Sequence, residues 1–251
     1  MEIINKEIIL KFVLSRKQND GGFSFAQEAP SNFEDTYFAL QTLYELQISY
    51  NNEKTFDIIR SVEMNNLLIK HMFQLTHLSK TYNLSLLWLE EVIKKQVLIQ
   101  ANDTQSIYYA AKIAHMRNNQ NLISELRKKK ISLSDREHLL SNLCWKTITL
   151  KKLGVEFDEQ RIAEDIKEFQ GYDGGFSFTR KGAPSFMEET YLAIEALSEL
   201  KQQPKNVQNC IHFVERCKAN NGGFGRQSVT VPTLENTYQS IAILNQLNNK
   251  V

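Results

Sequence analysis

Carboxylate side chains recur at equivalent places in the chain, and they are the residues best suited to acid chemistry. Glu34-Asp35, Glu188-Glu189 and Glu235 each stand shortly before a Thr-Tyr pair. A capping role at the start of a helix accounts for Glu34 and Glu188. Asp35 and Glu189 have no such role, and a carboxyl group whose pKa is raised by burial could protonate an alkene or an epoxide. We predict Asp35 and Glu189 as catalytic acids, with capping or solvation as the alternative.

Aromatic residues follow the same register. Tyrosines follow threonines at four places, and two tryptophans lie between the clear repeats: Tyr37, Tyr82, Tyr191 and Tyr238, and Trp88 and Trp145. Recurrence in a repeat is typical of a packing role. The functional alternative is the wall of a substrate cavity, since aromatic faces stabilise cations, including carbocations. We predict these six residues as substrate-binding, with the two tryptophans on inner helices.

The remaining reactive residues do not form a recognisable metal or nucleophile site. Cys210 and Cys217 share a helix face, but His212 points elsewhere, and no C-x-x-C or H-x-x-x-H spacing accompanies them. Buried thiols account for the cysteines better than a structural zinc does. The Gly-Gly-Phe segments lack the Lys-Ser/Thr of a phosphate-binding loop. We predict no metal and no cofactor.

A repeated stretch positions these residues. Residues 18–46 and 170–200 share a Gly-Gly-Phe-Ser-Phe segment, an Ala-Pro-Ser segment and a Thr-Tyr pair, and a third copy begins at Asn221. Paired glycines break one helix, and Ser31 with Glu34, or Ser185 with Glu188, would open the next as a capping box. Self-similarity of this kind indicates a repeat architecture.

The repeat predicts an all-α fold. Gly21 and Gly174 lie 153 residues apart, about three times the 48 residues from Gly174 to Gly222, so two degenerate repeats would fit at 53–97 and 102–153. We therefore expect one domain over residues 1–251, with about five helix pairs in an α/α toroid that is either an open horseshoe or a closed ring. The second helix of each pair would lie inside and the more charged helix outside.

The repeats resemble those of two families. Gln170-x-x-Asp173-Gly174-x-Phe176 is similar to a motif of squalene–hopene cyclases and related terpene cyclases, and Gly-Gly-Phe followed by Thr-Tyr resembles protein prenyltransferase β subunits. The resemblance is strong over the three clear repeats and weak in the middle. It implies a toroid of paired helices around a largely apolar cavity that holds an isoprenoid.

The catalytic motifs of those families do not carry over. No Asp-x-Asp-Asp segment occurs, and residues 234–238 read Leu-Glu-Asn-Thr-Tyr where the prenyltransferases have a zinc-binding segment with Cys and His. The Cys-Gly-Glu-Gln motif of thioester domains is also missing. The chain therefore resembles a short, divergent member of this group.

Composition argues against several other classes of protein. The chain has 251 residues, 42% of them hydrophobic and 24% charged, with a net charge of +1. The balanced charge argues against nucleic acid as a partner, and no apolar run is long enough to span a membrane. Three cysteines and a start that lacks the pattern of a signal peptide favour the cytoplasm.

Two functions remain open. The first is an enzyme that acts on an isoprenoid or similar hydrophobic substrate, with an acid-initiated cyclisation as the reaction and a prenyl transfer without zinc ligands as a variant. The second is a non-catalytic scaffold that binds a lipid-like ligand, a peptide or a protein partner, including a second copy of the chain, on its concave face.

Overall fold

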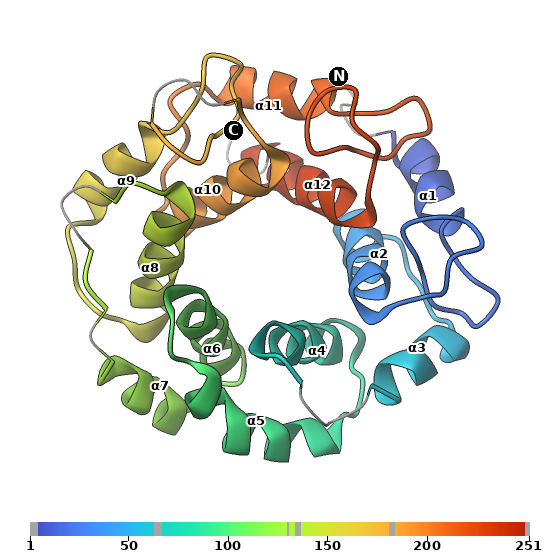
Figure 1. Ribbon diagram of the computed structural model, residues 1–251, viewed down its shortest axis with the longest axis horizontal. Helices are drawn as coiled ribbons and strands as arrows, with labels where there is room; N and C mark the ends of the chain where they lie inside the picture. Colours follow the sequence, from blue (N-terminus) through green and yellow to red (C-terminus); the bar gives the residue numbers. More distant parts are fainter. Residues whose placement is uncertain (1–4, 63–66, 130, 134–136, 181–183, 249–251) are drawn as a thin grey trace.

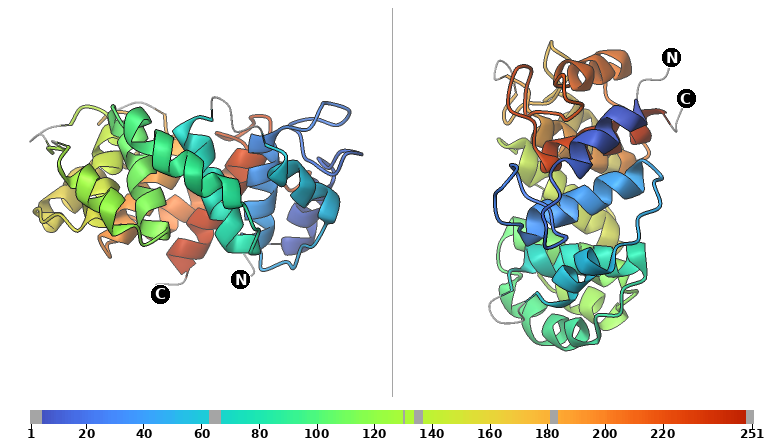
Figure 2. Two further views of the ribbon diagram at one scale, coloured as in Figure 1. Left: turned by 90° about the horizontal axis from the view of Figure 1, so that it is seen from below. Right: turned by 90° about the vertical axis from the view of Figure 1, so that its right-hand side faces the viewer.

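Two concentric rings of helices form the structure. The computed structural model describes residues 5–62, 67–129, 131–133, 137–180 and 184–248, which hold twelve helices and no named strand. The inner ring comprises α2 (Phe33–Glu45), α4 (Ile69–Tyr82), α6 (Thr104–Met116), α8 (Leu140–Leu153), α10 (Met187–Glu199) and α12 (Leu234–Asn248). The outer ring comprises α1 (Lys6–Leu14), α3 (Glu53–Arg60), α5 (Leu87–Gln100), α7 (Gln120–Arg127), α9 (Glu159–Lys167) and α11 (Val207–Arg216). Figure 1 shows the two rings from above and Figure 2 shows them edge-on.

The inner ring is closed. Each inner helix packs against the next one along the chain, and α12 packs against α2. The all-α toroid expected from the repeats is confirmed, in its closed form. In the three clear repeats the second helix lies inside and the first outside, as predicted, whereas α5, which carries Trp88 and was predicted as an inner helix, lies in the outer ring. The number of pairs is six rather than five. Three pairs occupy the middle of the chain, because α3 and α7 have only 8 residues each and are joined to their partners without the long glycine turn.

The glycine turns lock neighbouring pairs together. Gly174 has φ +92°, and a Cβ atom there would lie 2.0 Å from the carbonyl oxygen of Asn209 in α11. Gly222 has φ +91°, and a Cβ there would lie 2.5 Å from Ile8 of α1. Only glycine permits both the left-handed backbone and the close approach. The turn after α11 therefore seats against the first helix and closes the outer ring.

Each clear repeat also buries a phenylalanine under the start of an inner helix. The backbone N–H groups of Phe23, Phe176 and Phe224 donate to the hydroxyl oxygens of Thr36, Thr190 and Thr237 at 3.0, 2.9 and 3.0 Å. The threonine of each Thr-Tyr pair that follows a Gly-Gly-Phe segment thus fixes the turn. The tyrosine that follows it is thereby held at the lumen side of the helix.

The predicted capping boxes are wrong. Asn32 caps α2 by accepting from the backbone N–H of Asp35 at 2.8 Å, and the N-cap position of α10 is Phe186, without a side-chain bond. Ser31 and Ser185 instead donate to aspartates of the glycine turn, Asp20 at 2.6 Å and Asp173 at 2.5 Å. The serines belong to the turn because the chain reaches the helix one residue later than the sequence pattern suggested.

No helix among the described residues has both the length and the apolar character needed to cross a membrane.

Candidate functional site

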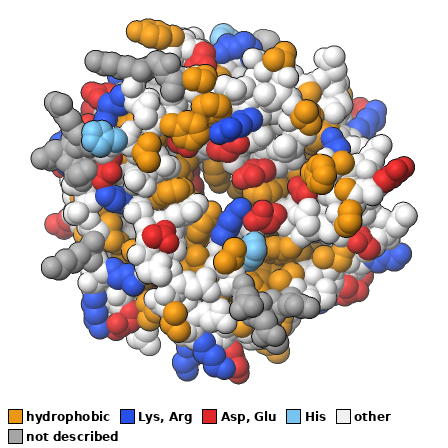
Figure 3. Space-filling model, in the orientation of Figure 1, with side chains coloured by type: hydrophobic (Ala, Val, Ile, Leu, Met, Phe, Trp, Pro, Cys, Tyr) orange, Lys and Arg blue, Asp and Glu red, His pale blue; other side chains and the backbone are white. Residues whose placement is uncertain are grey.

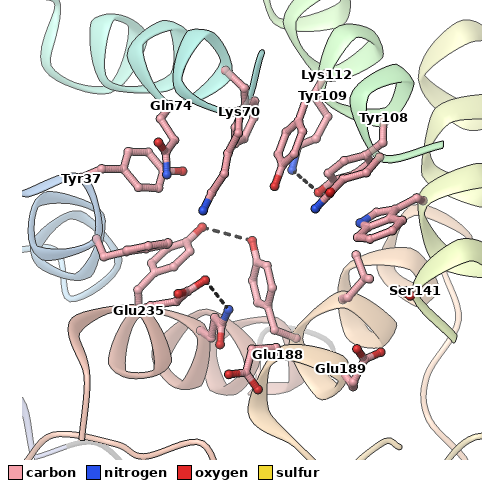
Figure 4. A pocket seen from close by; sticks show the side chains of 18 of the residues that line it. Tyr37, Lys70, Gln74, Tyr108, Tyr109, Lys112, Ser141, Glu188, Glu189 and Glu235 are labelled. Atoms are coloured by element: carbon pink, nitrogen blue, oxygen red, sulfur yellow. Dashed lines mark hydrogen bonds between the residues drawn. The ribbon is translucent and has the colours of Figure 1, made fainter. Parts of the chain in front are cut away.

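A cavity of about 400 Å³ lies in the centre of the inner ring. All six inner helices line it, mostly with their N-terminal halves, and Phe178 from the turn before α10 joins them. Figure 3 shows the ring hollowed at its centre, with hydrophobic side chains around the hollow and charged side chains among them. Figure 4 shows the lining side chains from close by.

Aromatic rings form most of the wall. Tyr238 of α12 lies between Tyr37 of α2, at 6.4 Å between ring centroids, and Tyr191 of α10, at 5.7 Å. On the far side, the Tyr108 ring of α6 lies 6.5 Å from Trp145 of α8. Rings presented from several helices offer π faces to a ligand on more than one side, which suits an apolar or cationic group.

The tyrosine hydroxyls are held by bonds within the protein. The hydroxyls of Tyr191 and Tyr238 lie 3.2 Å apart, and that of Tyr37 lies 3.0 Å from Nδ1 of His77. Burial lowers the pKa of His77 to about 4, with the Lys112 charge acting in the same direction. His77 is therefore neutral at neutral pH and serves as a hydrogen-bond partner rather than a charge.

An ion pair joins helices α6 and α10. The Lys112 ammonium of α6 donates to Glu195 of α10 at 2.5 Å and to the Tyr108 hydroxyl at 3.0 Å. The Tyr108 hydroxyl donates to the other Glu195 oxygen at 2.9 Å. The same ammonium lies 4.6 Å from the Phe73 ring centroid. Since α8 stands between α6 and α10, the pair links two helices that are not neighbours in the inner ring.

The charged groups at the mouth are mostly paired. Glu34 binds Lys70 at 2.9 Å and His71 at 3.3 Å, and these contacts, led by the His71 hydrogen bond, lower the pKa of Glu34 to about 2. Glu188 binds Arg226 at 3.1 Å. These carboxylates also meet the positive ends of the inner helices.

Glu189 differs from its neighbours. Its side chain lines the cavity, the residue is 6% exposed, and its Oε2 atom has no hydrogen-bond partner among the described residues. Burial raises the pKa of Glu189 to about 7, and the Glu188 charge adds to the effect. A carboxyl group with this pKa keeps its proton near neutral pH. Because no protein group in the described chain accepts that proton, it is free to be donated to a substrate, as a general acid requires.

Glu235 lies on the same side of the mouth. Burial raises its pKa, while the charge of Lys70 acts against this shift. Figure 4 places Glu188 and Glu235 along the α10 and α12 side of the cavity, with Lys70 reaching toward the centre from α4.

Five of the eight residues predicted for the site line this cavity, and three do not. Glu189, Tyr37, Trp145, Tyr191 and Tyr238 line it. Asp35, Tyr82 and Trp88 are not part of the lining.

The three outlying residues have structural positions. Asp35 bonds the side-chain amide of its cap, Asn32, at 2.5 Å, so it performs the capping that was expected of Glu34. The Tyr82 hydroxyl donates to the Leu40 carbonyl at 2.6 Å at the end of α4. Trp88 lies on α5 in the outer ring, not on an inner helix as predicted.

Several lining residues were not predicted from the sequence. They come from α4 and α6, whose repeats have lost the glycine turn: Phe73, Gln74, Tyr108, Tyr109 and Lys112. The neighbouring tyrosines 108 and 109, just after the start of a helix, are the one local signal that resembles the Thr-Tyr pairs.

The residues present do not fit a zinc ion. The segment that corresponds to the prenyltransferase ligands lies at the start of α12 and offers Glu235, Asn236 and Tyr238. No group of three or more His, Cys, Asp or Glu side chains in the described chain is arranged to hold a metal. Zinc sites need ligands of these types gathered at one point.

Comparison with known proteins agrees with the architecture. None of the curated proteins searched matches the chain. The family model for the prenyltransferase alpha-alpha toroid domain matches residues 1–202 and 185–251, which together cover the whole chain. A closed ring of helix pairs is the architecture that this description names, and the chain belongs to the prenyltransferase alpha-alpha toroid domain family.

Proposed function

We propose that the protein is an enzyme that binds an isoprenoid or similar hydrophobic substrate in the central cavity and isomerises it by proton-initiated cyclisation. The observation that carries the proposal is the unpartnered, buried Glu189 carboxyl in an aromatic wall. A volume of about 400 Å³ falls at the small end of ligand sites, which run from about 300 to 1,000 Å³. It favours a chain of a few isoprene units.

The proposed reaction begins with proton transfer. Protonated Glu189 donates to a carbon of an alkene, or to the oxygen of an epoxide, and a carbocation forms on the substrate. The π electrons of a second alkene close a ring onto this cation. Loss of a proton to solvent restores a double bond, and solvent returns a proton to the Glu189 carboxylate. The product is an isomer of the substrate.

The aromatic wall supports the cationic stage. Tyr191, Tyr238 and Trp145 line the cavity together with Glu189. Their faces would stabilise the cation that forms once Glu189 has given up its proton. Tyr37 lies next to Tyr238 and extends the same wall. Asp35 is not part of this mechanism because it lies outside the lining.

The test compares two acidic residues of equivalent sequence position. Glu189→Gln removes the proton and keeps the shape, and we expect turnover of an isoprenoid alkene or epoxide to fall about 10²–10⁴-fold. Asp35→Asn is the matched control and keeps turnover. Equal activity of Glu189→Gln and the wild type would refute the mechanism.

A second function has one observation in its favour. The hydroxyls of Tyr37, Tyr191 and Tyr238 are held within the protein, so the wall is rigid and preformed. Such a cavity would also suit a protein that binds a hydrophobic ligand without converting it. Tight binding of the same ligands by the wild type without product would support this alternative.

A further inference from the structure

The side chain of Gln74 leaves a hydrogen bond unmade inside the cavity. Gln74 lies in the second turn of α4 and is 1% exposed, and its Oε1 atom has no partner among the described residues. It lines the cavity, and Figure 4 shows it reaching from α4 beside Tyr37. Because a buried amide oxygen without a donor costs stability, a donor brought by a ligand would be favourable here.

Gln74 and Glu189 face the lumen from opposite sides. Helices α6 and α8 separate α4 from α10 on one path around the inner ring, and α2 and α12 separate them on the other. The two side-chain oxygens without a partner in the described chain, Gln74 Oε1 and Glu189 Oε2, therefore lie on opposite walls. A ligand that fills the cavity can place one end at each.

The cations of the cavity are already engaged. Among the described lining residues, the lysines are Lys70, which binds Glu34 at 2.9 Å, and Lys112, which binds Glu195 at 2.5 Å. Arg226 at the rim binds Glu188 at 3.1 Å.

Carboxylates, in contrast, are in excess. Glu188, Glu189 and Glu235 all line the cavity, and Glu34, Glu188 and Glu235 occupy the helix N-termini that would otherwise attract an anion. A diphosphate group would lose its hydration and meet like charges without a free cation to offset them.

We propose that the substrate is an uncharged isoprenoid alcohol, whose hydroxyl donates to Oε1 of Gln74 while an alkene of its chain lies against Glu189 on the opposite wall. The proposal rests on the proposed function for the role of Glu189, and it adds the head group and the orientation of the substrate. Gln74 is on this view a binding residue that sets specificity.

The experiment measures the binding of three probes that share one hydrocarbon chain. These are farnesol, the hydrocarbon farnesene and farnesyl diphosphate, titrated against the fluorescence of Trp145 in a Trp88→Phe background. Trp145 lines the cavity and Trp88 does not. We expect farnesol to bind more tightly than farnesene and farnesyl diphosphate to bind most weakly.

Two glutamine variants localise the effect. Gln74→Met keeps the volume of the side chain and removes the hydrogen-bond acceptor. We expect it to weaken the binding of farnesol about 2- to 10-fold and to leave the binding of farnesene unchanged. Gln105→Met is the matched control, because Gln105 also lines the cavity but its side chain is bonded to Tyr109. We expect Gln105→Met to bind farnesol more tightly than farnesene, as the wild type does.

Each result decides a different claim. If farnesene binds but farnesol binds no more tightly, or if Gln74→Met weakens the binding of both probes equally, the assignment of Gln74 is wrong. The proposal that the cavity binds hydrophobic ligands would still hold in either case. Tightest binding of farnesyl diphosphate also overturns the assignment. If neither farnesol nor farnesene binds, the proposed function fails, and this inference fails with it.

Discussion

Lys112 and Glu195 meet at 2.5 Å, from helices that are not neighbours in the ring. Their side chains are 14% and 13% exposed, and Tyr108 bonds both of them. The pair is a strut between α6 and α10. A buried pair of this kind is sensitive to the loss of one partner, since the other charge is left without compensation.

The first prediction concerns this strut. Lys112→Met or Glu195→Leu alone should lower the free energy of unfolding by about 3–5 kcal/mol, measured by urea denaturation. The double variant Lys112→Met with Glu195→Leu should recover most of the loss, because neither charge remains buried. Additive losses in the double variant would show that the two side chains do not act as a pair.

The second prediction concerns the glycine turns. Gly174→Ala should destabilise the protein by more than about 2 kcal/mol, because alanine resists a φ of +92° and its Cβ would overlap the backbone of Asn209.

Gly154→Asn is the control for the glycine prediction. Gly154 has φ +64° at the end of α8, and the nearest atom to a Cβ there is the Arg127 guanidinium at 3.1 Å. Asparagine tolerates this backbone, and a flexible side chain can move, so we expect a loss below about 1 kcal/mol. Similar melting temperatures for the two variants would contradict the packing of the turn against α11.

The sequence predicted the repeating parts of the fold because their glycines, threonines and phenylalanines each have a fixed structural task. Thr36, Thr190 and Thr237 bond the amides of the buried phenylalanines, so the Thr-Tyr pair marks the start of an inner helix where a Gly-Gly-Phe segment precedes it. Thr81-Tyr82 has no such segment before it and lies at the end of α4. The pairs α3/α4, α5/α6 and α7/α8 lack these signals. Their tertiary packing alone defines them, and one pair was missed for that reason.

Apart from Trp145 on α8, the site was predicted only in the clear repeats. Glu189 and the tyrosines of the clear repeats were found, whereas Gln74 and Lys112 came from degenerate helices with no pattern to mark them. Asp35 and Glu189 occupy equivalent places in sequence but not in environment. Asn32 captures Asp35 as a capping partner, and the residue at the corresponding N-cap of α10 is Phe186, which has no side chain able to do so.

The third prediction follows from the raised pKa of Glu189, about 7 in the folded protein against 4.5 ordinarily. The folded state binds this proton more tightly, so ionisation opposes folding, and stability falls as pH rises from about 4.5 through 7. Between pH 5 and pH 8, the free energy of unfolding of the wild type should therefore fall by up to about 3 kcal/mol relative to that of Glu189→Gln. Urea denaturation at both pH values measures the difference.

A second carboxyl group provides the control for the pH experiment. The pKa of Asp103 is lowered by its bonds to Ser106, against the effect of burial, so its titration is complete below pH 5. Asp103→Asn also keeps a good capping residue for α6. The difference in free energy of unfolding between this variant and the wild type should not change between pH 5 and pH 8. His77 is present in all three proteins, so its contribution to the pH dependence cancels in the comparison. Parallel pH profiles for wild type and Glu189→Gln would show that Glu189 ionises normally.

The most direct test of proton-initiated chemistry is the conversion of an isoprenoid alkene in D₂O, with the product analysed by mass spectrometry. The wild type is predicted to place one deuterium on carbon in each cyclised product, because Glu189 exchanges its proton with solvent before donating it. Glu189→Gln is predicted to form no labelled product while still binding the substrate. A cyclised product without deuterium from the wild type, or with unchanged labelling and rate from Glu189→Gln, would contradict the proposed role of this carboxyl group.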